Sequence, residues 1–186
     1  MKSVLITGCS SGIGFETALF LAQKGFQVYA GMRNLKDGRV LHDEASRRRV
    51  TLEVIALDID HPESIQQAVK NVISESGQIY GLVNNAGIQL RGFFEDLKDW
   101  EIRKVFETNV FGTMAVIKSV LPHMRKASCG RIVLISSIGG TLGSMALSAY
   151  CSSKFALEGF GESLAQEVRS FGMHVILFEP AIIHTS

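Results

Sequence analysis

The chain has 186 residues, of which 46% are hydrophobic, and this length allows one domain with a substantial core. Its formal net charge is +1, so no strong basic field would recruit nucleic acid or an anionic membrane. We therefore expect a single domain, residues 1–186, that acts on a small ligand.

Cysteine, histidine and hydrophobic patterns exclude further classes of protein. The 3 cysteines show no CxxC spacing and the 5 histidines form no HExxH-type set, which predicts a reducing compartment and no metal site. The first apolar run ends at Gly8, too early for the core of a signal peptide, and no run approaches membrane-spanning length. We expect a soluble, cytoplasmic protein with no membrane span.

The first motif is a buried strand, a glycine turn and a helix. Val4-Leu5-Ile6 is a short continuous apolar run, and helical spacing follows the turn up to Gly25. The turn contains small residues that let a bulky anion approach the backbone and the helix N-terminus: Gly8, Ser10, Ser11, Gly12, Ile13 and Gly14. This predicts a pyrophosphate site, although the spacing Gly-x-x-x-Gly-x-Gly differs from the common dinucleotide fingerprint. The alternative is a glycine turn without a ligand.

The next two strands end in residues that could recognise a nucleotide. Residues 26–30 form the second predicted strand, and Arg33 follows it without an acidic residue. Because an acid at this place binds the ribose of NAD and an arginine accommodates the extra phosphate of NADP, Arg33 favours NADP. Residues 52–57 form the third strand, and Asp58 and Ile59 follow it at the ligand-binding edge. The alternatives are a surface role for Arg33 and a turn or cap role for Asp58.

A fourth strand and a long helix supply amide side chains. Residues 79–83 lead into Asn84, Asn85, Ala86 and Gly87, where asparagines can cross-link loops and the small residues leave room for a flat ring. Residues 97–126 show one long helical pattern, too broadly apolar for a single narrow stripe, so the helix should pack on the sheet and on another helix or subunit. Asn109 lies inside it, as a hydrogen-bonded core amide or as a site residue.

Residues suited to acid–base chemistry follow the fifth strand, residues 131–135. Ser136 and Ser137 end that strand, and Tyr150 and Lys154 lie one turn apart in the next predicted helix, residues 148–171. A phenol has a pKa near ~10, and a neighbouring ammonium lowers it by favouring the phenolate. The pair could exchange a proton with an alcohol or carbonyl oxygen that a serine holds. The alternative is a buried tyrosine beside a solvated lysine.

The order of these elements predicts the fold. Further helices are expected at 36–49 and 62–77, and a sixth strand at 174–178. Alternating strands and helices with short loops indicate an α/β fold, a doubly wound, Rossmann-like parallel sheet in three αβα layers. Every motif above falls at the carboxyl edge of that sheet, where such folds bind ligands.

Together and in this order, the motifs resemble the short-chain dehydrogenase/reductase family over the whole chain. The residues that carry the resemblance are Thr7-Gly8-x-x-x-Gly12-Ile13-Gly14, Asn84 to Gly87, Asn109, Ser137, and Tyr150-x-x-x-Lys154. The sequence around Tyr150, and Gly31-Met32-Arg33, are similar to the 17-beta-hydroxysteroid and retinol dehydrogenase branch. That branch implies an apolar alcohol or ketone substrate. Thr185 matches the threonine that similar proteins use to hold the cofactor's carboxamide.

The resemblance implies an NADP(H)-dependent oxidoreductase that interconverts a carbonyl and an alcohol. Tyr150 would exchange the proton, Ser137 would hold the substrate oxygen, and Lys154 would bind the nicotinamide ribose. Asn109 would position a water that links Lys154 to solvent, and Asn85, Ala86 and Gly87 would contact the cofactor. A homodimer or homotetramer is also implied, since family members commonly pair through two long helices.

Two other functions stay open. An epimerase or dehydratase of nucleotide sugars also uses Tyr-x-x-x-Lys, but with a different glycine spacing in its turn. A dinucleotide sensor or scaffold without turnover would need the cofactor site alone.

The sequence departs from the family pattern in two ways. Pro180-Ala181 stands where the family has Pro-Gly, which removes some backbone freedom beside the nicotinamide. Family members also continue with a substrate-covering segment and a seventh strand, so we expect these 186 residues to be part of a longer chain.

Overall fold

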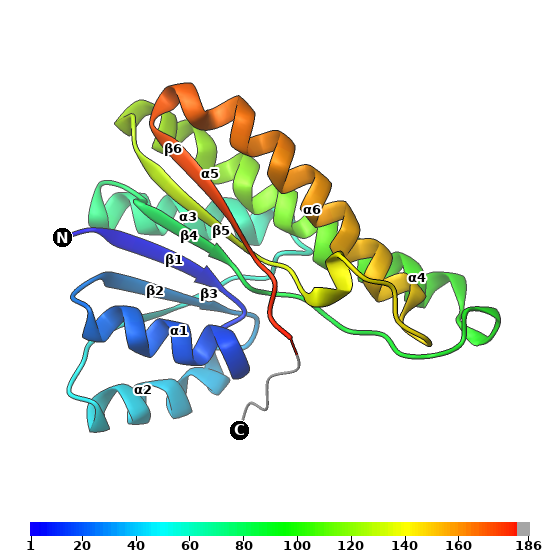
Figure 1. Ribbon diagram of the computed structural model, residues 1–186. Coiled ribbons are helices and arrows are strands. Elements are labelled where there is room, and N and C mark those ends of the chain that lie inside the picture. Colours follow the sequence, from blue (N-terminus) through cyan, green and yellow to red (C-terminus); the bar gives the residue numbers. More distant parts are fainter. Residues whose placement is uncertain (182–186) are drawn as a thin grey trace.

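A parallel sheet with helices on both faces forms the centre of the molecule (Figure 1), in a computed structural model that describes residues 1–181. Within these residues the sheet has 6 strands in the order β3-β2-β1-β4-β5-β6, and all neighbours are parallel. The strands are β1 (Ser3–Thr7), β2 (Gln27–Met32), β3 (Glu53–Ala56), β4 (Gly81–Asn84), β5 (Gly130–Ile135) and β6 (Met173–Phe178). The predicted doubly wound sheet is confirmed. Its strand order reverses between β1 and β4, where sheets of this kind open a ligand crevice.

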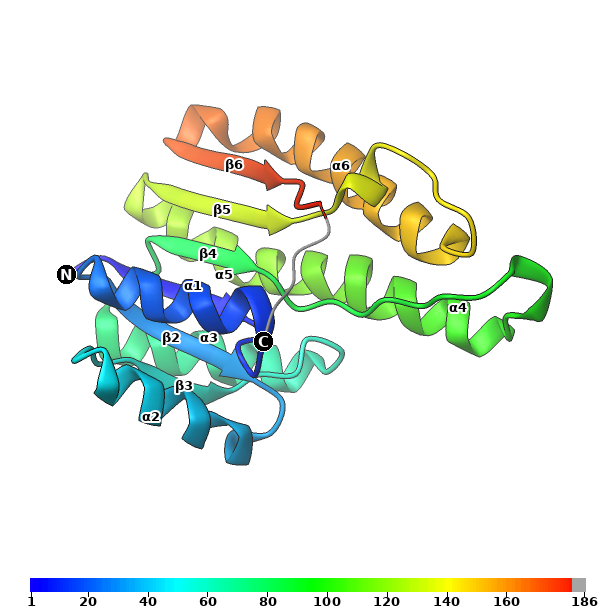
Figure 2. The same cartoon turned by 60° about the horizontal axis from the view of Figure 1, so that its bottom comes forward.

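The helices divide between the two faces of the sheet (Figures 1 and 2). They are α1 (Gly12–Gln23), α2 (Gly38–Arg47), α3 (Pro62–Ser76), α4 (Asp99–Phe106), α5 (Thr113–Ala127) and α6 (Ser148–Val168). Successive residues of β1 point to opposite faces, so Leu5 joins the core beneath α3, α5 and α6, whereas Val4 and Ile6 join the core beneath α1 and α2. This double burial explains the continuous apolar run in β1.

The edge strand β6 is covered less completely than β1. α6 packs on one of its faces, while Ile176 and Phe178 on the other are 41% and 48% exposed. In Figure 2, α1 and α2 lie over the part of the sheet formed by β1, β2 and β3, and they do not reach β6.

The long helix predicted at 97–126 has the expected extent but an unexpected hydrogen-bonding pattern. α4 continues into a π-helical segment, η3 (Glu107–Gly112), and then into α5 without a break. η3 passes so close to the loop after β3 that a Cβ on Gly112 would lie only 2.8 Å from the carbonyl oxygen of Ile59. Such π segments occur often at functional sites, and this one contains Asn109.

Candidate active site

Thr7 and Asn85 tie the glycine turn to the end of β4. The Thr7 hydroxyl accepts hydrogen bonds from the backbone N–H groups of Asn85 (3.0 Å) and Ala86 (2.9 Å). The Asn85 side chain donates to the carbonyl oxygens of Thr7 (3.0 Å) and Gly8 (2.9 Å). The predicted cross-linking role of the asparagine at this strand end is therefore confirmed.

Close packing explains why the turn contains glycine. Gly8 has a φ of 71°, and a Cβ there would lie 2.8 Å from Ala86 Cα. A Cβ on Gly14 would lie 2.4 Å from both the Gly8 carbonyl oxygen and Asn85 Nδ2. Any side chain at these positions would push the turn away from β4.

The N-terminus of α1 suits an anion such as a pyrophosphate. Ser11 is the N-cap residue but its side chain makes no capping hydrogen bond, and the first turn contains no acidic residue. The N–H groups and the positive end of the helix dipole therefore remain available to a ligand. Ser10, Ser11 and Ile13 line the adjoining cavity, whereas Gly12, with a φ of 62°, and the tightly packed Gly14 do not.

A cavity of about 880 Å³ joins the glycine turn to the residues after β5. Most of the predicted site residues line it, namely Gly8, Ser10, Ser11, Ile13, Arg33, Asp58, Ile59, Asn85, Ala86, Gly87, Ser137, Tyr150 and Lys154. Of the others, Asn109 is buried beside the cavity, and Thr185 lies outside the described residues. The structure thus brings residues from five strand ends to one place, as the topology requires.

Arg33 and Asp58 lie at the part of the cavity formed by β2 and the loop after β3. Arg33 is exposed and makes no ion pair with any residue of 1–181. Asp58 Oδ1 accepts a hydrogen bond from the Asp60 N–H (3.1 Å), and the Asp58 N–H donates to Ser64 Oγ (2.9 Å). Asp58 therefore stabilises its own turn and also faces the cavity.

Ser137 and Tyr150 meet around Gly139. A Cβ on Gly139 would lie 3.4 Å from Ser137 Oγ and 3.4 Å from Tyr150 Cε1, so both side chains border the same small space. Ser137 Oγ accepts a hydrogen bond from the Gly139 N–H at 3.0 Å. Since that bond uses a lone pair of the hydroxyl, its proton remains available to a substrate oxygen.

Lys154 is buried, in contrast to the solvated lysine of the alternative interpretation. Its side chain is 5% exposed, and Nζ lies 5.8 Å from the centroid of the Tyr150 ring. Nζ donates to the carbonyl oxygen of Ile135 at 2.8 Å, which anchors the lysine to the end of β5. Burial lowers the pKa of Lys154 to about 8, and the charge of Glu158 opposes that decrease.

Asn109 is a fully bonded core amide. Its side chain donates to the Ile88 carbonyl oxygen (2.9 Å) and to Ser153 Oγ (3.0 Å), and it accepts from the Ile88 N–H (2.8 Å). A Cβ on Gly87 would lie 3.2 Å from Asn109 Oδ1 and 3.7 Å from Lys154 Nζ, so the amide is also close to the lysine. Asn109 can therefore be both a hydrogen-bonded core amide and a residue of the site.

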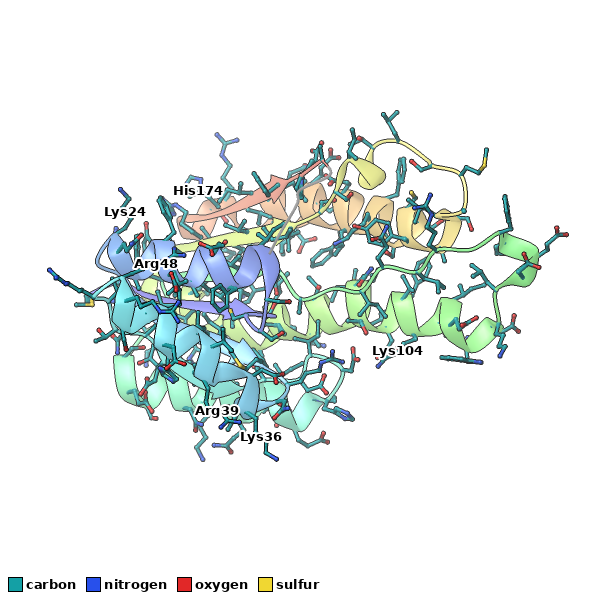
Figure 3. The ribbon with its side chains drawn as sticks, turned by 90° about the horizontal axis from the view of Figure 1, so that it is seen from below. Lys24, Lys36, Arg39, Arg48, Lys104 and His174 are labelled. Carbon is teal, nitrogen blue, oxygen red and sulfur yellow. The ribbon has the colours of Figure 1, made fainter. Side chains whose placement is uncertain are left out.

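One polar contact that the sequence did not predict joins the loop after β3 to the long helix. Asp60 Oδ2 accepts hydrogen bonds from Lys104 of α4, which is labelled in Figure 3, and from Thr108 of η3 at 3.1 Å. Asp60 and Thr108 both line the cavity. A charge pattern within one helix gives no signal for this contact, because the partners are 44 and 48 residues apart.

Two surface loops add cavity residues that no sequence motif singled out. Gln89 and Arg91 follow β4, and Ser144 and Leu147 precede α6. The loops touch where the Gly92 N–H donates to the Ala146 carbonyl oxygen at 2.9 Å. Their sequences carried no periodic pattern that could place them beside Ser137.

A glycine turn at the switch point of a parallel sheet, with a tyrosine and a buried lysine in the same cavity, is typical of doubly wound α/β proteins that bind ligands at this edge. Comparison with known families matches residues 2–186 to the short chain dehydrogenase family. The chain belongs to this family, as the sequence motifs predicted.

Individual relatives agree with this assignment. The chain is 42% identical to human retinol dehydrogenase 8 and 40% identical to human 17-beta-hydroxysteroid dehydrogenase type 1. These alignments cover 99% and 98% of the present chain. It spans 60% and 57% of the lengths of these two relatives. Among solved structures, ElxO with NADP bound shows a TM-score of 0.93 at 34% identity, with coverage of 100% of this chain and 75% of ElxO.

Two further properties concern the described residues only. None of their helices has the length and hydrophobicity that a membrane crossing requires. They contain no group of 3 or more histidine, cysteine, aspartate or glutamate side chains arranged to hold a metal ion.

Proposed function

We propose that this protein is an NADP(H)-dependent oxidoreductase that interconverts a carbonyl and an alcohol. The observation that carries the proposal is the meeting of Ser137 and Tyr150 around Gly139, in the cavity that also contains the glycine turn. The turn fits a dinucleotide, because its glycines leave no room for side chains and the α1 N-terminus has no competing acid. When bound, the nicotinamide would supply or accept the hydride.

Ser137 and Tyr150 would act on the substrate oxygen. The Ser137 hydroxyl, fixed through its lone pair by the Gly139 N–H, donates a hydrogen bond to that oxygen and polarises the carbonyl. Tyr150 donates its phenolic proton to the same oxygen during reduction and takes it back during oxidation. The charge of Lys154 stabilises the phenolate that this step leaves behind.

Asn109 would support this centre by fixing its geometry. It holds Ile88 on one side and, through Ser153, the helix that carries Tyr150 and Lys154. Both of its amide protons are used in these bonds, so Asn109 could contact the water predicted to link Lys154 with solvent only as an acceptor, through the second lone pair of its side-chain oxygen.

Arg33 and the relatives support the finer parts of the proposal. An exposed arginine at the end of β2 suits the extra phosphate of NADP, and the similar ElxO structure contains NADP. Ile88, Ile138 and Leu147 give the cavity apolar walls near Ser137, and the similar retinol and hydroxysteroid dehydrogenases are named for apolar alcohols. We therefore propose an apolar carbonyl or alcohol as substrate.

A homodimer or homotetramer is also part of the proposal. Trp100 and Phe111 on the long helix are 63% and 55% exposed, and Phe155 on α6 is 47% exposed. The continuous helix formed by α4, η3 and α5 runs alongside α6 (Figures 1 and 2), so a second copy could cover these side chains together.

Separate titrations with NADPH and NADH, followed by a carbonyl screen, test the function. We expect tighter binding of NADPH and loss of its absorbance with at least one steroid, retinoid or aliphatic carbonyl compound. Cofactor binding without turnover on any carbonyl would favour a sensor or scaffold. Conversion of a nucleotide sugar without net NADPH consumption would favour an epimerase or dehydratase.

A further inference from the structure

Two buried polar atoms next to the catalytic centre have no role in the function described above. Ser136 Oγ and Glu158 Oε1 are both buried, and neither makes a hydrogen bond with any residue of 1–181. Buried polar groups are nearly always paired, because an unpaired one loses its hydration without compensation. These two atoms therefore indicate an interaction that Ser136 and Glu158 can form with each other.

The space around Gly140 brings the two side chains together. A Cβ on Gly140 would lie 2.7 Å from Ser136 Oγ and 3.1 Å from Glu158 Oε1. The hydroxyl proton can rotate about its C–O bond, so Ser136 can donate to the glutamate oxygen directly or through one water. Glycine at position 140 leaves the room that this contact needs.

Glu158 also lies one helical turn after Lys154 on α6, so both side chains occupy the same face of that helix. Burial alone would favour the neutral amine, since it lowers the pKa of Lys154 to about 8, and Glu158 is the acidic group that opposes this decrease. The other charged or titratable groups around the cavity are Tyr150 on α6, Asp58 and Asp60 after β3, Arg33 after β2 and Arg91 after β4. Asp60 already pairs with Lys104.

We propose that Glu158 is a positioning residue of the catalytic centre: held by Ser136 in the space over Gly140, its carboxyl group keeps Lys154 charged. The consequence for catalysis rests on the proposed function, in which the charge of Lys154 assists Tyr150. The effect of Glu158 on the charge of Lys154 does not, because it is already present in the protein without cofactor. Glu158 touches neither substrate nor cofactor in this role, because it does not line the cavity.

Lysine side-chain NMR of the full chain without cofactor tests the charge. The Lys154 signal is assigned with Lys154→Met, and its titration is followed in wild type, in Glu158→Gln and in the matched control Glu162→Gln. Glu162 is an exposed residue one turn further along α6. We expect the Lys154 midpoint to fall by about 1 pH unit in Glu158→Gln and to stay unchanged in the control. An unchanged midpoint in a folded Glu158→Gln protein would overturn the proposal.

Thermal unfolding tests the contact with Ser136. If Ser136 and Glu158 interact, the decrease in melting temperature of the double variant Ser136→Ala/Glu158→Gln should be smaller than the sum of the decreases of the two single variants. Strictly additive losses would contradict the pairing. A chain that binds no dinucleotide yet shows the expected Lys154 shift would contradict the proposed function and leave this inference intact.

Discussion

The two sides of the cavity that we propose for cofactor binding and for catalysis are built by opposite means. Around the glycine turn, Gly8 and Gly14 work through the absence of side chains, and backbone atoms form the surface. Across the cavity, Ser137, Tyr150 and Lys154 work through functional groups, one of which is a buried charge. Substitutions should therefore harm the first side through steric conflict, and the second through lost chemistry with little steric effect.

Tyr150→Phe should separate chemistry from binding most strongly. Loss of the phenolic proton removes the general acid, so we expect turnover to fall about 10²–10⁴-fold, with cofactor affinity and melting temperature nearly unchanged. The control Tyr80→Phe alters a tyrosine that packs against Lys2 outside the cavity, and it should retain turnover. Near-normal turnover in Tyr150→Phe would remove the basis of the mechanism.

Lys154→Met should abolish most turnover and yet stabilise the protein. Wild type carries the penalty of a buried ammonium, which corresponds to about 3 kcal/mol for a pKa lowered from 10.5 to about 8. Between these two values the folded chain has released the proton while the unfolded chain still binds it, so wild-type stability rises with pH. The extra stability of Lys154→Met over wild type should thus be greatest below pH 8 and should vanish above pH 10.5.

Chemical denaturation of Lys154→Met and wild type at several pH values between 7 and about 10.5 measures this difference. If the difference in unfolding free energy between the two proteins stays constant over this range, the lysine is not the group that titrates. If wild type is the more stable protein at pH 7, the hydrogen bond from Nζ to Ile135 outweighs the burial penalty.

Gly14→Ala should act through steric conflict alone. The added methyl group meets the Gly8 carbonyl oxygen and Asn85 Nδ2 at 2.4 Å, so the turn must move. We expect a stability loss of about 1–3 kcal/mol and a decrease of about tenfold or more in cofactor affinity. Gly159→Ala, in open space on α6, is the matched control and should stabilise the chain by about 0.5–1 kcal/mol. Equal effects of the two changes on cofactor affinity would contradict the packing argument.

Arg33→Ala should have the smallest effect, because it changes which cofactor is bound rather than whether one is bound. We expect NADPH affinity to fall about tenfold, equivalent to about 1.4 kcal/mol, while NADH affinity stays constant. Arg39→Ala, an exposed arginine on α2 that is labelled in Figure 3 and lies outside the cavity lining, serves as control. Isothermal titration with each cofactor distinguishes the outcomes, and parallel losses for both would assign Arg33 a general electrostatic role.

Local patterns in the sequence were sufficient for the fold and for many of the residues that line the cavity. The apolar run in β1 predicted burial on both faces. The helical segments predicted to end at residues 77 and 171 do end there, where Gly77 and Gly172 are the C-cap residues with φ angles of 74° and 72°. Many of the residues that line the cavity follow strands, and strand ends can be found from apolar periodicity. Topology then places those ends together.

Features that depend on contacts distant in the sequence could not be predicted. The space shared by Ser136 and Glu158 exists because β5 and α6 pack around Gly140, and the bonds of Asn109 join segments 21 and 44 residues away. The burial of Lys154 likewise arises from tertiary packing, since a lysine in a helix is ordinarily exposed. In each case the decisive partner lies in another element.

The π-helical segment places a constraint on insertions and deletions. One residue of an α-helix turns the chain by about 100°, so removal of a single residue from Glu107–Gly112 would rotate α4 relative to α5 by roughly that angle. Trp100 and Val105 would then face different neighbours, while α5 stayed on the sheet. Substitutions in this stretch should therefore be tolerated more readily than any change in its number of residues.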